Sequence, residues 1–393
     1  MKQMRHVRVR LPAREHYEIE IGANALERVG EIARRSLSPH ARRIAVVSNA
    51  RVFKLYGAGV VRHLRAAGFD VSHWLMADGE RHKNLRTATR ALAFFSESKL
   101  ERTDAALALG GGVVGDLAGF AAAIYLRGIP FLQAPTTLLA QIDASVGGKT
   151  AVNTPDGKNL IGAFHQPRAV VISTETLLTL PPRELTAGWC EAIKQGAVGS
   201  QRLFEQTQRF LVGERTNDPA RTLEGAHRRT DELASLIAAH CSFKAKIVAG
   251  DEREDVGRTD ALSRRILNFG HTAAHALEAI TQYRRFRHGE AVGYGMLVAA
   301  EISQRLGMLD ASGLESLQAC VRLAGRLPRA DDLDERAILR AIASDKKSVG
   351  GHVRWVLLER IGRARIVDGR EIPSRVVRDA LRSALAKSST DKK

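Results

Sequence analysis

The segment Asp143–Gly162, DASVGGKTAVNTPDGKNLIG, gathers lysines, glycines and hydrogen-bonding side chains in a pattern that a packed core does not need. Lys149 follows two glycines, whose missing side chains let backbone N–H groups approach a ligand, and Lys158 and Asn159 lie in a second polar stretch. This pattern predicts a binding site for a phosphate or a carboxylate. The alternative is a solvated β-hairpin with its turn at Pro155–Gly157.

A glycine-rich turn precedes this segment. The apolar run DAALALG is followed by GG and then by VVGDLAGF. These three stretches predict a strand, a tight turn and a helix. Gly110, Gly112 and Gly115 fit the pattern G-x-G-x-x-G, in which a helix N-terminus holds a pyrophosphate through free N–H groups and its dipole. The acidic residue that usually binds the ribose about twenty residues later is absent, because that region reads PTTLLAQ. A relative of the dinucleotide-binding turn with different ribose contacts remains open.

Three histidines form a third group of candidate residues. His271 and His275 are four residues apart and would share a helix face, and His288 follows in RRFRHGEAVGYGM. With a carboxylate from elsewhere they would bind zinc, and Glu191 in GWCEAIKQG is a candidate because it lies beside Lys194 in an otherwise apolar segment. The alternative is that each histidine is an ordinary polar or capping residue.

Long motifs in a fixed order give the chain a family resemblance. They are GGGVVGDLAGF, YLRG, PTTLLAQIDASVGGKTAVNTPDGKNLIGAFHQP, GWCEAIKQG, DERE, LNFGHTAAHALE and HGEAVGYGM. Together they resemble the 3-dehydroquinate synthases, and the resemblance spans roughly residues 15 to 385. Related sugar-phosphate cyclases share most of these motifs.

The resemblance implies a lyase of the shikimate pathway, and so of chorismate and aromatic amino acid biosynthesis. Such an enzyme converts 3-deoxy-D-arabino-heptulosonate 7-phosphate to 3-dehydroquinate and inorganic phosphate. It oxidises the C5 hydroxyl, eliminates phosphate, reduces the ketone, opens the ring and closes a carbocycle by aldol addition. NAD is regenerated in each cycle, and a divalent metal, zinc or cobalt, polarises the developing carbonyl.

The resemblance also assigns roles to residues. It implies metal ligands Glu191, His271 and His288, so that His275 would instead relay protons in the substrate pocket, although spacing alone favours the pair four residues apart. The residues implied to act on the substrate are Asp143, Lys149, Lys194, Arg264, Asn268 and His275 in catalysis, and Arg127, Lys158, Asn159, Lys244 and Lys346 in binding its charged groups. Arg127 would reach the phosphate from a neighbouring subunit, since the resemblance implies a homodimer.

The NAD site implied by the resemblance draws on residues from several segments. These are Asn49, Glu80, Lys83, Gly111, Gly112, Val113, Asp116, Thr136, Thr137, Thr179 and Glu184. Glu80, in DGERHK, would bind the ribose in place of the missing downstream acid. A plain charged turn is the alternative for DGERHK.

Two features depart from the pattern expected of the family. The link DVGRTDALS between Glu254 and Arg264 is longer than expected, which leaves the placement of these two residues open, and it would be a surface insertion. Cys190 adjoins the candidate ligand Glu191, and we expect it to pack in the core because free cysteine is usually buried.

The elements that position these residues divide the chain in two. Residues 1–174 alternate short β-rich runs such as RIAVVSN and AVVIST with helical stretches, which predicts a Rossmann-like parallel α/β domain that binds NAD. Residues 175–393 are mainly helical, with a late hairpin near HVRWVLLERIGRARIV and a last helix in SRVVRDALRSALAK, and would bind metal and substrate. The active site would then lie in the cleft between the domains, bridged by Asp143–Gly162.

Composition narrows the other possibilities. The net charge of +17 and the pI near 10.3 raise a nucleic-acid-binding protein as a rival, but the basic residues are dispersed and aromatic residues make up only 5%, so we expect no nucleic-acid partner. The charge would instead steer anionic substrates. No apolar signal segment and no run of about eighteen apolar residues is present, which predicts a cytoplasmic protein without a membrane span. The remaining rivals are 2-deoxy-scyllo-inosose synthase, a valiolone-type cyclase and a metal-dependent polyol dehydrogenase.

Overall fold

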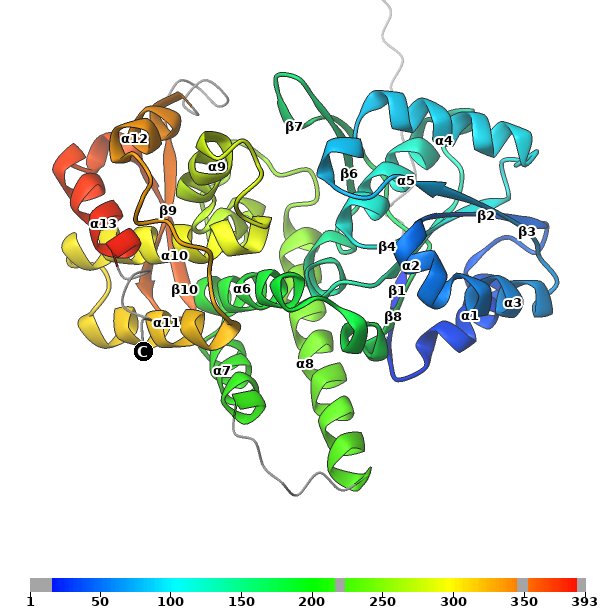
Figure 1. Ribbon diagram of the computed structural model, residues 1–393, viewed down its shortest axis with the longest axis horizontal. Coiled ribbons are helices and arrows are strands. Elements are labelled where there is room, and N and C mark those ends of the chain that lie inside the picture. Colours follow the sequence, from blue (N-terminus) through cyan, green and yellow to red (C-terminus); the bar gives the residue numbers. More distant parts are fainter. Residues whose placement is uncertain (1–15, 216–222, 345–352, 387–393) are drawn as a thin grey trace, which may run out of the picture.

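The computed structural model describes residues 16–215, 223–344 and 353–386. A sheet covered by helices forms one half of the molecule, and a mainly helical assembly forms the other (Figure 1). The α/β fold predicted from the sequence, a parallel α/β half followed by a mainly helical half, is confirmed.

The sheet has six parallel strands, in the order β1 (Glu18–Gly22), β8 (Ala169–Ser173), β5 (Phe131–Pro135), β4 (Ala105–Gly110), β2 (Arg43–Asn49) and β3 (Asp70–Met76). The central strands are apolar on both faces, because alternate residues of each strand enter two separate cores. In β2, Ile44 and Val46 enter one core, and Ala45 and Val47 enter the other.

Helices cover both faces of this sheet. The short α2 (Ala50–Val52) leads toward α3 (Ala58–Ala66), which packs with α1 (Val29–Ser36) on one face, and α4 (Leu85–Glu97) and α5 (Gly112–Ile124) pack on the other. Because the strands are all parallel, their carboxyl ends lie at the same edge of the sheet, where ligands of open α/β sheets bind.

The polar segment after β5 forms a hairpin outside the main sheet. Strands β6 (Lys149–Thr154) and β7 (Gly157–Phe164) pair antiparallel, so the hairpin alternative raised by the sequence is real. Gly147 and Gly148 before it have φ values of 100° and 63°, and a Cβ on Gly147 would lie 2.7 Å from Nη2 of Arg264. These two glycines let the chain turn against Arg264 on its way into the hairpin.

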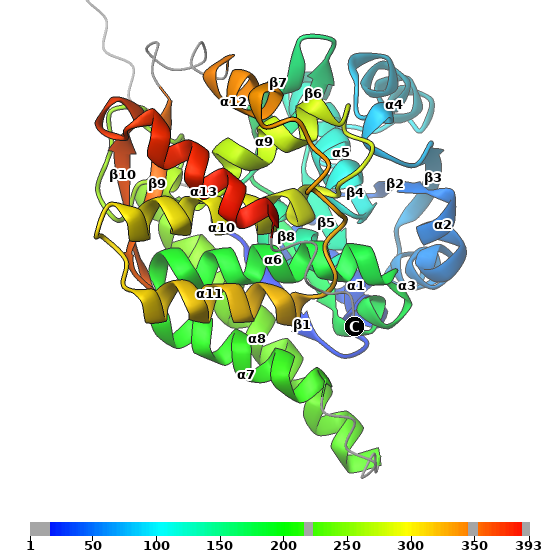
Figure 2. The ribbon, with the colours of Figure 1, turned by 60° about the vertical axis from the view of Figure 1, so that its left-hand side comes forward.

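The helical half consists of α6 (Pro182–Gly199), α7 (Gln201–Arg215), α8 (Leu223–Gly250), α9 (His271–Ile280), α10 (His288–Arg305), α11 (Ala311–Ala324), α12 (Glu335–Ser344), the hairpin β9 (Arg354–Arg360) and β10 (Arg363–Asp368), and α13 (Ser374–Ala386). Figure 2 shows α13 lying across α10, with α6 and α11 below them. Because α10 is buried on nearly all sides, it is the central helix of this half.

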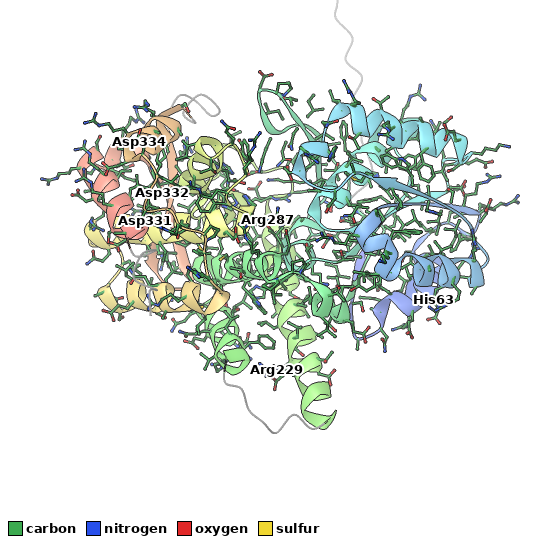
Figure 3. The ribbon with its side chains drawn as sticks, in the orientation of Figure 1. His63, Arg229, Arg287, Asp331, Asp332 and Asp334 are labelled. Atoms are coloured by element: carbon green, nitrogen blue, oxygen red, sulfur yellow. The ribbon has the colours of Figure 1, made fainter. Side chains whose placement is uncertain are left out.

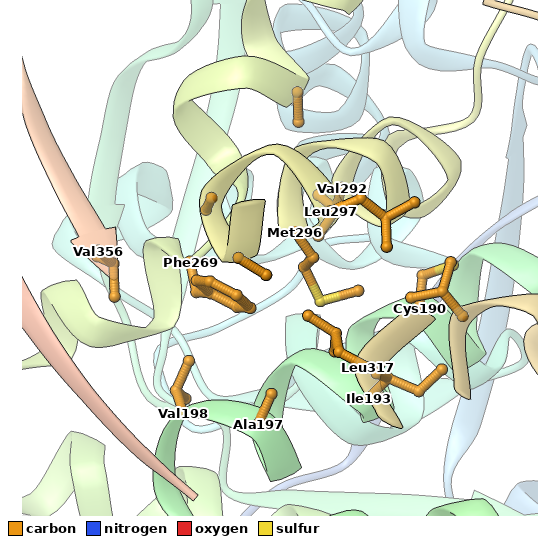
Figure 4. Close-up of a cluster of buried hydrophobic side chains, with 14 of the residues drawn as sticks. Cys190, Ile193, Ala197, Val198, Phe269, Val292, Met296, Leu297, Leu317 and Val356 are labelled. Atoms are coloured by element: carbon orange, nitrogen blue, oxygen red, sulfur yellow. The ribbon is translucent and has the colours of Figure 1, made fainter. Parts of the chain in front are cut away.

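A large apolar core fixes α6, α9 and α10 relative to one another. Ile193 from α6, Phe269 before α9 and Met296 from α10 meet in it, as Figure 4 shows. Cys190 lies in the same core and is fully buried, which confirms its predicted packing role.

Helix α8 is the one described helix with a long apolar stretch. Its residues Arg229–Gly250 are long and apolar enough to cross a membrane by length and composition. The stretch carries His240 and Lys244 buried within the protein and packs on β1, α6 and α7. Core helices of soluble proteins pass the same test, so this finding is weak evidence, and the absence of a membrane partner stays a prediction.

Candidate active site

A cavity of about 1330 Å³ lies where the carboxyl ends of the strands face the helical half. It is lined by most of the residues that the sequence singled out, namely Asn49, Glu80, Lys83, Gly111, Gly112, Val113, Asp116, Thr136, Thr137, Asp143, Lys149, Lys158, Asn159, Thr179, Glu184, Lys194, Lys244, Arg264, Asn268, His271, His275 and His288. Segments far apart in the chain therefore meet at one place.

The glycine turn forms one wall of the cavity. Gly111 precedes the first residue of α5, and Gly111–Val113 line the cavity, so the N-terminus of this helix faces it. A Cβ on Gly111 would lie 3.0 Å from Cγ2 of Thr137. Glycine is therefore favoured where the turn passes the segment after β5, as the sequence pattern predicted.

Lys83 connects this wall to the hairpin. Its ammonium is buried, pairs with the Asp116 carboxylate, and donates to Oδ1 of Asn159 at 2.6 Å. Burial raises the pKa of Asp116, while the nearby charge of Lys83 opposes this rise. Glu80 accepts a hydrogen bond from Nδ2 of Asn153 at 2.8 Å, which ties the DGERHK turn to β6.

Glu191, His271 and His288 offer ligand atoms that all lie within 4.8 Å of one another. The two histidines are the first residues of α9 and α10, and Glu191 comes from the middle of α6. Glu191 is fully buried, and neither of its carboxylate oxygens has a hydrogen-bond partner in acceptable geometry, although Nζ of Lys194 lies 2.5 Å from Oε2. A buried carboxylate of this kind beside two imidazoles fits a divalent cation.

The third histidine, His275, lies next to this group but outside it. Its ring centroid is 5.5 Å from that of His271 and 6.3 Å from that of His288, and His275 lines the cavity. The spacing-based pair of His271 and His275 is thus not the pair that converges on Glu191. His275 lies one turn after His271 on the same face of α9, where it lines the cavity without joining the group around Glu191.

The protonation states of the two converging histidines differ. Burial and the nearby charges of Lys194 and His288 hold the pKa of His271 well below its ordinary value, which keeps its imidazole neutral. Burial also lowers the pKa of His288, but the hydrogen bond and charge of Glu278 outweigh it and raise the pKa above the ordinary value. Glu278 is therefore the dominant neighbour of His288.

The sequence analysis did not include Glu278 among the site residues. It is only 2% exposed, accepts from Nζ of Lys158 at 2.9 Å, and pairs with Nδ1 of His288 at 3.2 Å. These contacts overcome the effect of burial and lower the pKa of Glu278 to about 2. The available signal was its spacing of seven residues from His271 and three from His275, which places all three on one helix face.

A second ionic group lines the same cavity. Asp143, in the short helical segment Ala140–Ala144, forms an ion pair with Lys244 of α8. Although burial opposes it, the charges of Lys244 and Lys194 lower the pKa of Asp143, so this carboxylate stays ionised. Burial lowers the pKa of Lys244, and the nearby positive charge of Arg264 lowers it further. Cations held so closely together favour an anionic ligand.

Lys149 lies at the outer part of the cavity and pairs with Glu254. Asn268 also donates to Glu254, at 3.4 Å, and Glu254 has the left-handed backbone φ of 55°. The sequence analysis left the position of Glu254 open, and the structure puts it at the cavity.

The long link after Glu254 is exposed at its centre, and a hydrogen bond joins the residues on either side of it. Val256 is 55% exposed, whereas the Asp251 carboxylate accepts from the backbone N–H of Arg264 at 2.8 Å. The extra residues thus form a surface insertion that leaves Arg264 buried at the cavity.

An ion pair at the cavity joins α6 to the start of α10. Arg287, labelled near the centre of the molecule in Figure 3, pairs with Glu184 at 2.8 Å.

Three of the predicted residues are not among those of the described chain that line the cavity. Glu191 is fully buried in α6, where it lies beside the cavity residues His271 and His288. Arg127 is exposed after α5 and does not line the cavity, and Lys346 lies outside the described residues.

The fold and the cavity define a class of α/β proteins in which a parallel sheet and a helical half meet at a cavity near the carboxyl ends of the strands. The structure is similar to 2-epi-5-epi-valiolone synthase from Streptomyces hygroscopicus subsp. jinggangensis, solved with NAD+ and Zn2+ bound, with a TM-score of 0.82, 24% identity, and coverage of 97% of this chain and 100% of that one. It is also similar to a 2-deoxy-scyllo-inosose synthase solved with carbaglucose-6-phosphate, NAD+ and Co2+, with a TM-score of 0.75, 23% identity, and coverage of 93% and 96%. Identities this low establish the shared fold.

Within that class, the chain belongs to the 3-dehydroquinate synthase family. Residues 73–187 match the family's N-terminal sequence model and residues 188–348 match its C-terminal one. The chain is 41% identical to the 3-dehydroquinate synthase of Nostoc punctiforme, over 95% of this chain and 98% of the relative, and 43% identical to that of Gloeobacter violaceus, over 96% and 99%. The resemblance found in the sequence is confirmed.

Proposed function

We propose that this protein converts 3-deoxy-D-arabino-heptulosonate 7-phosphate to 3-dehydroquinate and phosphate, with NAD and a divalent metal as cofactors. Family membership supports the reaction class. The observation that carries the proposal is the fully buried Glu191 carboxylate, whose oxygens accept no hydrogen bond in acceptable geometry. It lies beside His271 and His288, which line the same cavity as the glycine turn.

The cofactors would be held by the two opposite walls of the cavity. Glu191, His271 and His288 would bind zinc or cobalt, which as a Lewis acid would polarise a substrate oxygen. The N-terminus of α5 at Gly111–Val113 would bind the pyrophosphate of NAD, which would accept and return one hydride. The other implied contacts to NAD are Asn49, Glu80, Lys83, Asp116, Thr136, Thr137, Thr179 and Glu184, all of which line the cavity.

The residues between these walls would bind the doubly charged substrate. Lys194, Lys244 and Arg264 are buried cations on one side, and Lys149, Lys158, Asn159 and Asn268 line the more open side. Asp143 would orient a substrate hydroxyl while Lys244 keeps it ionised, and His275 would carry protons to and from hydroxyl groups. Buried cations bind anions strongly because little water screens them.

The assembly that we propose includes a second copy of the chain. Arg127 is exposed outside its own cavity, and Leu126 and Arg127 both have positive φ values, of 49° and 67°. A homodimer in which Arg127 enters the partner's cavity would use this exposed turn. We likewise infer a cytoplasmic enzyme with a domain division after residue 174.

The nearest rival activities are those of cyclases whose substrates have no carboxylate. We expect phosphate release from the heptulosonate phosphate at least about 100-fold faster, as kcat/KM, than from a sugar phosphate of similar length without a carboxylate, because each charge-assisted contact contributes about 1.5–3 kcal/mol. Phosphate is measured with the purified protein, NAD and zinc or cobalt. Preference for the sugar phosphate would instead support an inosose- or valiolone-type cyclase.

A further inference from the structure

Glu278 uses each of its carboxylate oxygens for a different part of the active site. Oε2 faces Nδ1 of His288 at 3.2 Å, and Oε1 accepts from Nζ of Lys158 at 2.9 Å. His288 begins α10 in the helical half, whereas Lys158 comes from β7 of the hairpin. One buried side chain therefore connects the candidate metal group with the strand on the other side of the cavity.

The contact with His288 selects one form of the imidazole. A carboxylate accepts hydrogen bonds, so Nδ1 of His288 carries a proton, and the other ring nitrogen, Nε2, which lies 3.6 Å from Oε1 of Glu191, is the atom that would bind a metal. His271 shows the same arrangement, since its Nδ1 lies 3.3 Å from the carbonyl oxygen of Phe269. That oxygen belongs to the backbone, so Glu278 is the partner that a side-chain substitution can remove.

The contact with Lys158 compensates the buried charge. Because Glu278 is 2% exposed, an ionised carboxylate here requires a cation or donors nearby. The Lys158 ammonium meets this need and in turn lies 4.3 Å from the centre of the Tyr283 ring. Lys158 is therefore held at the cavity by residues of the helical half.

We propose that Glu278 is a positioning residue that fixes the metal-binding orientation of His288 and anchors Lys158 of the hairpin beside it. The inference rests on the proposed metal group and extends it to a carboxylate outside the three proposed ligands. Carboxylates that orient metal-binding histidines raise metal affinity by holding the ring and increasing its basicity.

The test is the zinc affinity of the full-length protein, measured by competition with a chromophoric chelator. Glu278→Gln keeps the size of the side chain and removes its charge, and we expect zinc binding about 10- to 100-fold weaker. Glu301→Gln is the matched control, because Glu301 is also buried, lies further along α10, and accepts from Oγ of Ser383 at 2.8 Å. It should bind zinc as the wild type does.

Two more variants separate the contacts and protect the test against misfolding. Lys158→Met removes the lysine but keeps the carboxylate beside His288, so its zinc affinity should stay closer to the wild type than that of Glu278→Gln. Glu278→Asp keeps the charge on a shorter side chain, and its zinc affinity should lie between those of the wild type and Glu278→Gln. Thermal unfolding of each metal-free variant identifies folded samples, and Glu278→Asp decides the result if Glu278→Gln does not fold.

The outcomes distinguish this inference from the proposed function. A wild-type protein that does not retain zinc would overturn the metal group itself. Tight zinc binding by the wild type and equally tight binding by folded Glu278→Gln would overturn only the role of Glu278. Equal losses in Glu278→Gln and Glu301→Gln would also overturn it, because they would indicate a general effect of removing a buried charge.

Discussion

Opposite charges are paired residue by residue throughout the cavity. Asp143 pairs with Lys244, Asp116 with Lys83, and Glu254 with Lys149. In each pair the two opposite charges lie in contact, which offsets part of the cost of burying them. Glu191 also lies beside a cation, Lys194, but neither of its buried oxygens accepts a hydrogen bond in acceptable geometry, and it faces two imidazoles, which together favour a role as a cation ligand.

Replacing the three histidines one at a time separates metal binding from proton transfer. We expect His271→Ala and His288→Ala to lose metal on dialysis, because each removes one of three protein ligands. His275→Ala should retain metal and lose activity by about 10²- to 10⁴-fold, the usual contribution of a proton-transferring group. Metal analysis by mass spectrometry beside phosphate release measures both. Full metal content in dialysed His288→Ala would show that the ligand set is wrong.

Patterns in the sequence alone predicted the glycine turn, the polar segment with Lys149, Lys158 and Asn159, and the histidine group, whereas the family resemblance supplied most of the other predicted residues. The glycines, lysines and histidines stood out because a core does not need them at such spacing. Glu278 was missed for a physical reason: a glutamate in a helix looks like an ordinary surface residue. Only the packing of α9 against α10 and the hairpin buries Glu278 beside its partners.

At the scale of elements, helix starts and strand ends carry the site. His271 and His288 begin α9 and α10, Gly111 precedes α5, and Asn49 ends β2. A buried polar network holds three of the supporting helices together. His240 of α8 contacts Oε1 of Gln195 in α6 at 3.0 Å and Oγ1 of Thr207 in α7 at 3.1 Å. Gln195 also donates to the carbonyl of Ile142, one residue before Asp143.

This network predicts a dependence of stability on pH. Burial lowers the pKa of His240 to about 3, so the folded state binds fewer protons than the unfolded state below the ordinary histidine pKa of about 6.5. The contribution of neutral His240 to the free energy of unfolding is complete above about pH 6.5 and is lost as the pH falls toward 3. About 2 kcal/mol of it is lost between pH 7 and pH 5. Urea unfolding of the wild type and His240→Gln at both pH values measures it.

His240→Gln should have lower stability at pH 7 but a weaker dependence on pH. Other titrating groups affect both proteins alike. The difference between the two proteins in the slope of unfolding free energy against pH therefore isolates His240. Equal slopes in the two proteins would show that His240 does not remain neutral in the folded state. The sequence did not indicate this network, because the three residues are far apart in the chain and each is common on helix surfaces.

At the scale of the whole molecule, a parallel α/β half and a helical half meet at one cavity, and the largest core joins the two halves through Val170 and Ile172 of β8. The division into a parallel α/β half and a helical half followed from hydrophobic periodicity, which is local in sequence. The position of Glu191 against two helix starts depends on long-range packing and came from the family resemblance rather than from spacing. The positive net charge of +17 fits a cavity that attracts a doubly charged substrate, in line with electrostatic steering.

The central claim is that the hydride taken from the substrate returns to it within one catalytic cycle. The most direct measurement follows phosphate release and NADH absorbance in the same sample of wild-type protein, metal, heptulosonate phosphate and a small amount of NAD. We expect many equivalents of phosphate for each NAD, matched by dehydroquinate, with no lasting NADH absorbance. Steady accumulation of NADH in proportion to the substrate consumed would contradict the claim and support a metal-dependent dehydrogenase.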